Sequence, residues 1–190
     1  MSEITIPTAV LDACVLYPAP MRDTLLCFAE QRLYMPQWSD IITDEWLRNL
    51  LKNRPDLKKE KSLRTIAQMN SYFDEANVAD FEYHIPTIQL PDPDDRHVVA
   101  CAIRGGATII VTKNLKDFPA EELAKFDLIA QDPDNFICDL FEMDKKNSVK
   151  AFKAQLISLK NPPQTKEELL ETFRNNDFPK AAELFAQITE

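Results

Sequence analysis

The sequence predicts an α/β fold with a buried parallel sheet, on three observations. Residues 8–16 and 107–112 form runs that are apolar on both faces, as expected of strands covered on both sides. Stretches with helical spacing of apolar residues separate these runs. Acidic residues stand inside or just after the runs, and we expect them to converge where the carboxyl ends of the strands meet. The 190 residues suffice for one core but are few for two.

In the N-terminal part of the chain, prolines and capping residues mark where elements begin and end. Pro18 and Pro20 close the first apolar run, and apolar residues spaced by four (Ile42, Trp46 and Leu50) indicate a helix. The expected elements are a strand over 8–16, a helix over 21–32, a very short strand over 33–36, a helix from a cap at Ser39 or Asp40 to about Asn53, a helix over 58–76 and a short strand over 78–81.

In the C-terminal part, the clearest elements are a short buried helix and the strand after it. Residues 98–103 are all apolar, and Gly105-Gly106 supplies a helix end. Beyond the strand at 107–112, the expected elements are a short helix after Pro119, an apolar stretch over 128–130, a mostly helical segment over 134–160, a break at 161–163, and two short amphipathic helices over 166–174 and 179–188. This tail is open to three interpretations: a helical extension, an oligomer contact such as a homodimer interface, or an arm that binds a partner.

The chain is acidic overall, but its charge is uneven. A net charge of −9 argues against a protein coated for non-specific binding to DNA. Between residues 48 and 64, however, seven Lys or Arg outnumber two acidic residues. This stretch is either a solvated helix face or a local patch that contacts phosphates beside an acidic site. The candidate contacts are Lys52, Arg54, Lys58, Lys59 and Lys61.

The four cysteines, Cys14, Cys27, Cys101 and Cys138, are widely spaced among apolar neighbours. No pair has the short spacing of a zinc site, so we expect small core residues of a protein in a reducing compartment. No signal peptide is evident, and no apolar run approaches the length of a membrane span. These features predict a cytoplasmic protein without a membrane partner.

Asp12 is the most informative acidic residue, because it lies inside an otherwise apolar run. Burying a charge is costly unless the charge is paired or bound to a metal, which favours a functional role over a structural aspartate bonded to nearby backbone. Glu45 alone is less informative, since Arg48 at i+3 offers it an ordinary surface partner. It borders the apolar face of its helix, however, and could reach the sheet edge.

Asp94 and Asp95 follow a Pro-Asp-Pro turn at the start of the buried helix. Aspartate is a favoured helix cap, so one acid here needs no further account, but two exceed what a cap requires. Asp117 follows the clearest strand, and its alternative is an ordinary turn residue. Nearby, Thr112 and Asn114 offer a hydroxyl and an amide that could hold a water or a phosphate.

Carboxylates gathered at one sheet edge repel one another and resist ionising together. A hard divalent cation relieves that repulsion, and Mg²⁺ or Mn²⁺ prefers such oxygen ligands. His84 and His97 do not form a metal pair, and the sequence contains neither a recognisable Ser-His-Asp arrangement nor a glycine loop for phosphate. The sequence therefore favours a Mg²⁺-dependent hydrolase over catalysis by a nucleophilic side chain.

Four segments together resemble the PIN-domain nucleases, and specifically bacterial PIN proteins related to VapC-type toxins. The segments are Leu11-Asp12, Glu45-Trp46-Leu47-Arg48-Asn49-Leu50, Pro91-Asp92-Pro93-Asp94-Asp95-Arg96-His97-Val98, and Asn114-Leu115-Lys116-Asp117-Phe118-Pro119. The last two are specific when they occur together. The resemblance covers roughly residues 9–140 and implies a three-layer α/β/α sandwich with a parallel sheet. We expect a PIN-like domain over residues 1–142 and a helical C-terminal extension over 143–190, packed on it or projecting from it.

The resemblance also implies a Mg²⁺- or Mn²⁺-dependent ribonuclease and its ligands. Carried over by position, the catalytic and metal-binding acids are Asp12, Glu45, Asp95 and Asp117. Asp95 is preferred because the family's acid precedes a pair of small residues, matched by Ala100 and Ala102, and Asp94 is the second candidate ligand. Thr112 and Asn114 match the supporting polar positions.

One departure from the family pattern is Cys14, which stands where many relatives have asparagine. A thiol cannot replace the hydrogen bonds of an amide, so this departure bears on how Asp12 is positioned.

The expected function is endonucleolytic hydrolysis of RNA by the toxin of a toxin–antitoxin pair, with a cognate antitoxin as partner. Two alternatives differ in class. A haloacid-dehalogenase-like phosphatase would use Asp12 as a nucleophile, but it needs a second aspartate where Cys14 stands. A catalytically weak module that binds nucleic acid or protein on the same fold is the other alternative, because fold does not fix function. Metal-dependent cleavage of RNA would distinguish it from the nuclease.

Overall fold

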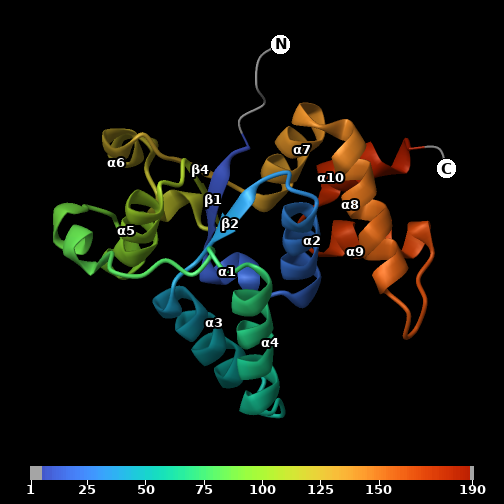
Figure 1. The fold of residues 1–190 in the computed structure, drawn as a ribbon, viewed down its shortest axis with the longest axis horizontal. Coiled ribbons are helices and arrows are strands. Elements are labelled where there is room, and N and C mark those ends of the chain that lie inside the picture. Colours follow the sequence, from blue (N-terminus) through green and yellow to red (C-terminus); the bar gives the residue numbers. More distant parts are fainter. Residues whose placement is uncertain (1–5, 189–190) are drawn as a thin grey trace.

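A parallel sheet lies at the centre of the computed structural model, which describes residues 6–188 (Figure 1). In that range the sheet has four strands in the order β2-β1-β3-β4, namely β1 (Thr8–Leu11), β2 (Met35–Gln37), β3 (Ile109–Val111) and β4 (Ile129–Gln131). Every pairing is parallel. All the strands therefore end at one side, which we call the carboxyl edge.

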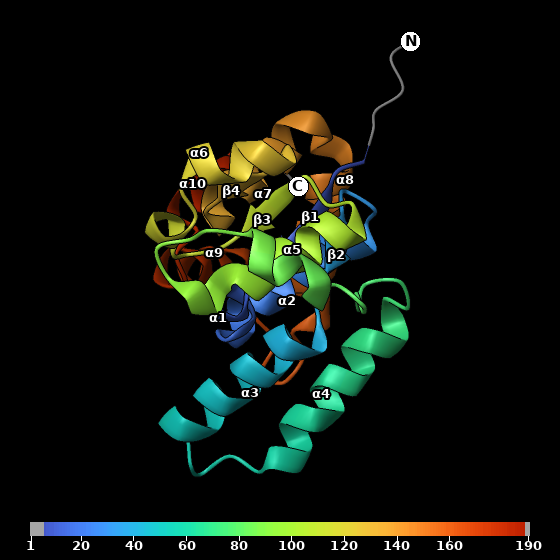
Figure 2. The same ribbon diagram turned by 90° about the vertical axis from the view of Figure 1, so that its left-hand side faces the viewer.

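Helices cover both faces of this sheet, which confirms the predicted three-layer α/β/α class. Helix α5 (Arg96–Gly105) packs on β1 and β3. Helices α2 (Ala19–Glu30) and α7 (Pro133–Met143) lie on the opposite side (Figures 1 and 2). Helix α5 ends at Gly106, whose φ of 66° is left-handed and easily adopted only without a Cβ.

The first apolar run divides at Asp12, which differs from the single strand predicted over 8–16. Strand β1 ends at Leu11, and the short helix α1 (Ala13–Leu16) begins directly after Asp12. Apolar periodicity cannot separate a short buried strand from a short buried helix. The predicted strand over 78–81 is also absent from the described structure, where this region forms one isolated bridge between Trp38 and Asn77.

Helices α3 (Asp40–Asn53) and α4 (Lys59–Tyr72) form a hairpin that projects from the body of the molecule (Figure 2). Ser39 caps α3 as predicted, because its hydroxyl accepts a hydrogen bond from the backbone N–H of Ile42 at 3.3 Å. Helix α4 is shorter than predicted, since the chain leaves it at Tyr72 to run back beside Trp38.

The C-terminal helices pack on the body rather than project from it. They are α8 (Lys145–Ser158), α9 (Lys166–Asn175) and α10 (Pro179–Ala186). Phe152 and Phe185 stack with ring centroids 4.7 Å apart, and Phe28 of α2 meets Phe185 edge-on at 5.9 Å. The tail therefore shares the main hydrophobic core. Where the PIN-like domain ends, at residue 142 or elsewhere, stays a prediction.

The remaining elements are short. They are helix α6 (Ala120–Leu123) and 3₁₀ turns at Glu82–Thr87, Pro93–Asp95, Leu115–Asp117 and Ala124–Phe126. Within the described residues, no helix has both the length and the apolar character needed to cross a membrane.

Candidate metal centre

Asp12 lies at the carboxyl edge, between the two central strands. Its backbone N–H donates to the carbonyl of Val111 at 3.1 Å, which continues the pairing of β1 with β3 for one more residue. Its side chain is buried, with 3% of its surface exposed. Burial raises the pKa of Asp12, and the charge of Glu45 raises it further, whereas hydrogen bonds from Thr112 and Cys14 oppose the shift.

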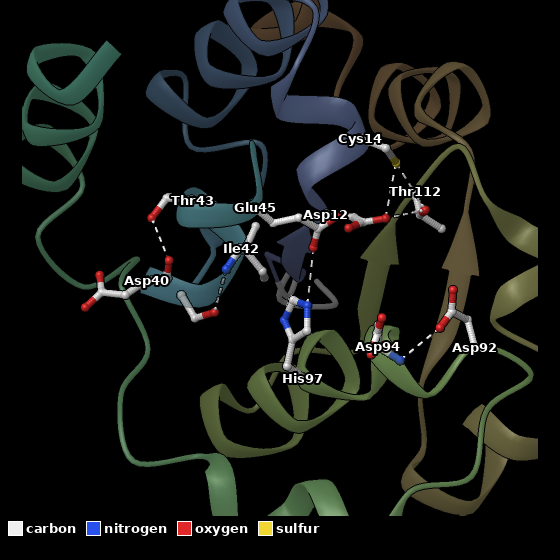
Figure 3. Close-up of polar contacts among 11 residues, drawn as sticks. Asp12, Cys14, Asp40, Ile42, Thr43, Glu45, Asp92, Asp94, His97 and Thr112 are labelled. Atoms are coloured by element: carbon white, nitrogen blue, oxygen red, sulfur yellow. Dashed lines mark hydrogen bonds and ion pairs between the residues drawn. The ribbon is translucent and has the colours of Figure 1, made fainter. Parts of the chain in front are cut away.

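Thr112 and Cys14 both hold one oxygen of the Asp12 carboxylate (Figure 3). The Thr112 hydroxyl donates to Oδ2 at 2.7 Å, and the Cys14 thiol donates to the same oxygen at 3.1 Å. The thiol in turn accepts from the backbone N–H of Lys113 at 3.2 Å. Burial raises the pKa of Cys14 to about 12, which keeps it protonated and able to donate. Cys14 therefore contributes to positioning Asp12, although it is not the amide of the family pattern.

Glu45 reaches the same region from α3 and meets His97 of α5 (Figure 3). The distance from His97 Nε2 to Glu45 Oε2 is 3.4 Å, and the side chains are 10% and 30% exposed. Glu45 thus pairs with His97 and makes no ion pair with Arg48 in the described structure. Sequence reasoning missed this contact. The available signal was the place of His97 in the first turn of a buried helix, beside the candidate acids.

Asp95 and Asp94 differ in what they face, although they are adjacent. Asp95 is partly buried at the start of α5, and its pKa is raised to about 7. Burial is the main cause, and the charges of Asp12, Asp92, Asp117 and Glu45 add to it. Asp94 is exposed, and its backbone N–H donates to Asp92 Oδ1 at 2.9 Å as part of the turn (Figure 3). The charges of the other acids therefore act on Asp95, the more buried member of the pair.

Asp117 and Asn114 lie in the loop that leaves β3. Asp117 is partly buried in a 3₁₀ turn and acts on this site through its charge, which raises the pKa of Asp95. Asn114 is exposed, and its backbone N–H donates to the Thr112 hydroxyl at 3.0 Å. The loop thereby fixes Thr112, which in turn fixes Asp12.

The donor set of this edge suits a hard divalent cation, because the charges of Asp12, Glu45 and Asp117 all raise the pKa of Asp95 there. As the side chains stand, no group of three or more His, Cys, Asp or Glu among residues 6–188 converges closely enough to enclose an ion. Mg²⁺ usually keeps several of its waters and takes one or two carboxylates directly. Carboxylates that act partly through water therefore fit such an ion without closing around it.

The predicted basic contacts lie in and beside the loop that joins α3 to α4 (Figure 2). Arg54 forms a two-point ion pair with Asp56, at 2.8 and 2.7 Å. The whole set is exposed, comprising Lys52, Arg54, Lys58, Lys59 and Lys61.

The chain belongs to the PIN domain family, which confirms the resemblance seen in its sequence. The family profile described as "PIN domain" matches residues 8–116, more than half of the chain. A second profile, described as "VapC50 C-terminal domain", matches residues 133–187, which contain helices α7 to α10. This range starts before residue 143, where the sequence placed the extension.

A similar protein is found in Mycobacterium tuberculosis (strain ATCC 25618 / H37Rv), where it is described as "Putative ribonuclease VapC50". The two chains are 35% identical over 77 residues, which are 40% of this chain and 46% of the relative. The similarity thus spans less than half of the relative's length. No solved structure matches the chain significantly.

Proposed function

We propose that this protein is a metal-dependent endoribonuclease that hydrolyses RNA phosphodiester bonds at the carboxyl edge of its sheet. The main observation is geometric: Asp12 is buried at the carboxyl edge and is hydrogen-bonded by Thr112 and Cys14. Glu45 reaches the same edge from α3, where it meets His97, and the charges of these acids help raise the pKa of Asp95 to about 7. Membership of the PIN domain family and the likeness to a protein described as a ribonuclease support this reading.

Mg²⁺ or Mn²⁺ would be held by Asp12, Glu45 and Asp95, directly or through water, and Asp117 would complete the site or serve a second ion. Asp94 is the second candidate for the position assigned to Asp95. A divalent cation supplies charge stabilisation for the phosphoryl and leaving oxygens and lowers the pKa of a nucleophilic water.

The surrounding side chains of this chain orient that site. Thr112 and Cys14 both bond to Oδ2 of Asp12, which leaves Oδ1 as the oxygen better placed for an additional ligand. His97 restrains Glu45 from α5. Asn114, exposed at the mouth of the edge, would hold a water or the scissile phosphate. These roles follow the general rule that groups behind the ligands set their orientation.

The biological role proposed is that of a toxin in the cytoplasm, held inactive by a cognate antitoxin protein that covers the acids. The resemblance to VapC-type proteins and the second family profile support this part of the proposal. Co-purification with a small protein encoded beside it, and release of RNA cleavage when that protein is removed, would test the role.

The activity is tested by incubating the purified protein with total cellular RNA, with and without Mg²⁺ or Mn²⁺, and mapping the new ends. Asp12→Asn and Asp95→Asn should each lose at least about 100-fold in cleavage, since each removes charge stabilisation worth several kcal/mol. Asp94→Asn should retain most activity, because Asp94 is exposed in the turn before α5, where a negative charge favours the start of a helix.

Titration calorimetry with Mn²⁺ supplies a measurement independent of cleavage. Wild type should bind, and Asp12→Asn should bind much more weakly. If Asp94→Asn abolishes cleavage while Asp95→Asn keeps it, the assignment of the third acid is wrong by one residue. If all three variants cleave like wild type, the nuclease is a contaminant or uses another site.

A further inference from the structure

A cavity of about 400 Å³ lies where the α3–α4 hairpin meets α1 and α2. We call it the hairpin cavity, and the side chains that matter here are Tyr17, Arg22, Trp46, Arg54 and Lys61. Helix α1 connects the cavity to the candidate metal centre. Asp12 and Tyr17 flank the two ends of α1, which places them roughly 8 Å apart along the chain axis. Trp46 directly follows Glu45 on α3.

The hairpin cavity is positive in a protein that is otherwise acidic. Of the described residues that line it, three are cationic and none is acidic, whereas the whole chain has 31 acidic against 22 basic residues. Two of these cations have acidic partners outside the lining: Arg22 lies 3.6 Å from Asp23, and Arg54 is paired with Asp56, with both of the latter side chains more than half exposed. An exposed pair of this kind is weak, so a phosphate could take the place of Asp56. The charge distribution favours an anionic ligand.

The wall of the hairpin cavity is also aromatic and rigid. The Arg22 guanidinium lies 4.9 Å from the Trp46 ring centroid and donates to the carbonyl of Leu16 at 3.0 Å. The indole N–H of Trp46 is buried and has no acceptor among the described residues. Tyr17 is only partly buried, and its hydroxyl accepts a hydrogen bond from Asn53 at 3.3 Å. A partly exposed ring beside cationic side chains suits a stacked base, because every base has a π-face.

We propose that the hairpin cavity binds a nucleotide of single-stranded RNA beside the cleaved bond, with the base stacked on Tyr17 and a phosphate held by Arg54 and Lys61. This proposal rests on the proposed ribonuclease function. The proposal separates the five basic residues predicted to contact RNA into two groups. Arg54 and Lys61 line the hairpin cavity and would contact RNA there. Lys52, Lys58 and Lys59 do not line it and add only to the surrounding positive field.

An acidic peptide could pair with the cations of the hairpin cavity, but single-stranded RNA also explains its aromatic wall. The hairpin cavity combines positive charge with an aromatic wall, and sequence-tolerant binding of single strands uses that combination. The hairpin cavity lies at the end of α1, the helix that begins after Asp12. A nucleotide bound there would belong to the same RNA strand as the bond cleaved at Asp12. Unstacked bases are needed for this contact, which favours single-stranded over double-stranded RNA.

The test measures fluorescence anisotropy of the full chain with a fluorescein-labelled, single-stranded 2′-fluoro oligonucleotide that resists cleavage. Tyr17→Leu should weaken binding by about 5- to 150-fold, the equivalent of ~1–3 kcal/mol per stacked base. Tyr17→Phe keeps the ring and should bind nearly like wild type. Arg54→Gln and Lys61→Gln should each reduce the slope of log affinity against log salt by about 0.7. Lys150→Gln and Lys153→Gln, on the exposed side of α8, are the charge-matched controls and should leave binding unchanged.

The outcomes separate this proposal from the function on which it rests. If Tyr17→Leu, Arg54→Gln and Lys61→Gln bind like the α8 controls while wild type cleaves RNA, the hairpin cavity is not the RNA site and the ribonuclease stands. If the variants weaken binding as expected but wild type does not cleave with either metal, the cavity is supported and the enzyme is not. Failure of wild type to bind the probe overturns the hairpin cavity as an RNA site, and the cleavage assay alone then decides whether the protein is a ribonuclease. Tighter binding of an oligoglutamate peptide than of the oligonucleotide assigns the cavity to an acidic protein segment. Thermal melts of each variant check that it is folded.

Discussion

Two buried aspartates, Asp12 at the carboxyl edge and Asp134 in the C-terminal helices, have opposite surroundings. Their exposed fractions are similar, at 3% and 5%. Asp134 accepts a backbone hydrogen bond on each oxygen, from Lys180 N–H at 3.0 Å and Ala181 N–H at 2.9 Å. Asp12 receives its side-chain hydrogen bonds on one oxygen only, and other acids lie near it.

This difference distinguishes a structural acid from a candidate functional one. The carboxylate of Asp134 meets the first N–H groups of α10, where unpaired donors and the helix dipole favour negative charge. It therefore joins α7 to α10. The charge of Asp12 is opposed by burial and by Glu45, which raise its pKa, and a carboxyl group perturbed in this way at a sheet edge is a reason to expect a function. Burial alone would not have separated the two.

The largest expected effect on stability is that of Asp134→Ala. Removing a carboxylate that accepts two buried hydrogen bonds should lower the free energy of unfolding by about 2–3 kcal/mol. Urea denaturation measures this, with Glu142→Ala, an exposed acid in the same helix, as the control. Asp12→Asn should cause no such loss, because it removes a charge that burial opposes. If Asp12→Asn destabilises the protein more than Asp134→Ala does, Asp12 is a structural acid and the distinction drawn here is wrong.

Cys14→Ala tests how Asp12 is held. It removes the thiol that donates to Asp12 Oδ2, so metal-dependent RNA cleavage should fall by about 10-fold, as for a group that orients a ligand. Cys14→Ser keeps a donor and should retain most activity. Cys138→Ala is the matched control, since Cys138 lies in α7, outside the acidic edge. Equal kcat/KM for Cys14→Ala and wild type would show that Thr112 suffices.

Asp95→Asn should change how stability depends on pH. The pKa of Asp95 is raised to about 7 in the folded protein from an ordinary value of 3.8, so its protonated form favours the fold. That stability is fully present below about pH 4 and is lost as the pH rises to about 7 and beyond. In metal-free buffer, Asp95→Asn should therefore melt about 2 °C above wild type near pH 8 and equal it near pH 4. Asp94→Asn should give no such gain. An equal rise in melting temperature for Asp94→Asn and Asp95→Asn would mean that the neighbouring acids do not act specifically on Asp95.

The smallest expected effect concerns the ion pair that connects the two regions. Lys113, in the loop after β3, lies 2.5 Å from Asp177, between α9 and α10. The side chains are 38% and 61% exposed, so a double-mutant cycle with Lys113→Gln and Asp177→Asn should give a coupling below about 1 kcal/mol. High salt should reduce it further. A larger coupling that resists salt would mean that the tail and the acidic edge behave as one unit.

Much of the fold could be predicted because its signals are local. Ser39 caps α3, prolines stop helices, and Gly106 ends α5, and each acts within a few residues. The acids at the carboxyl edge were predictable for a related reason. A parallel strand that ends in an aspartate presents that residue at the edge wherever the strand lies in the sheet. The sequence also contained two strings specific enough to identify the PIN family.

Contacts between distant segments were decided by the tertiary structure alone. Asp12 and Thr112 are 100 residues apart in the chain, and Cys14 and Lys113 are 99 apart. No local pattern shows that Cys14 donates to Asp12, that Glu45 faces His97, or that Asp134 caps α10. Propensity and periodicity act over a turn or a strand, whereas the partner of a buried polar group depends on which elements pack together. The sequence by itself therefore determined which residues carry charge and where elements end. Packing decided which acids accept hydrogen bonds on both oxygens and which keep an oxygen available for a ligand.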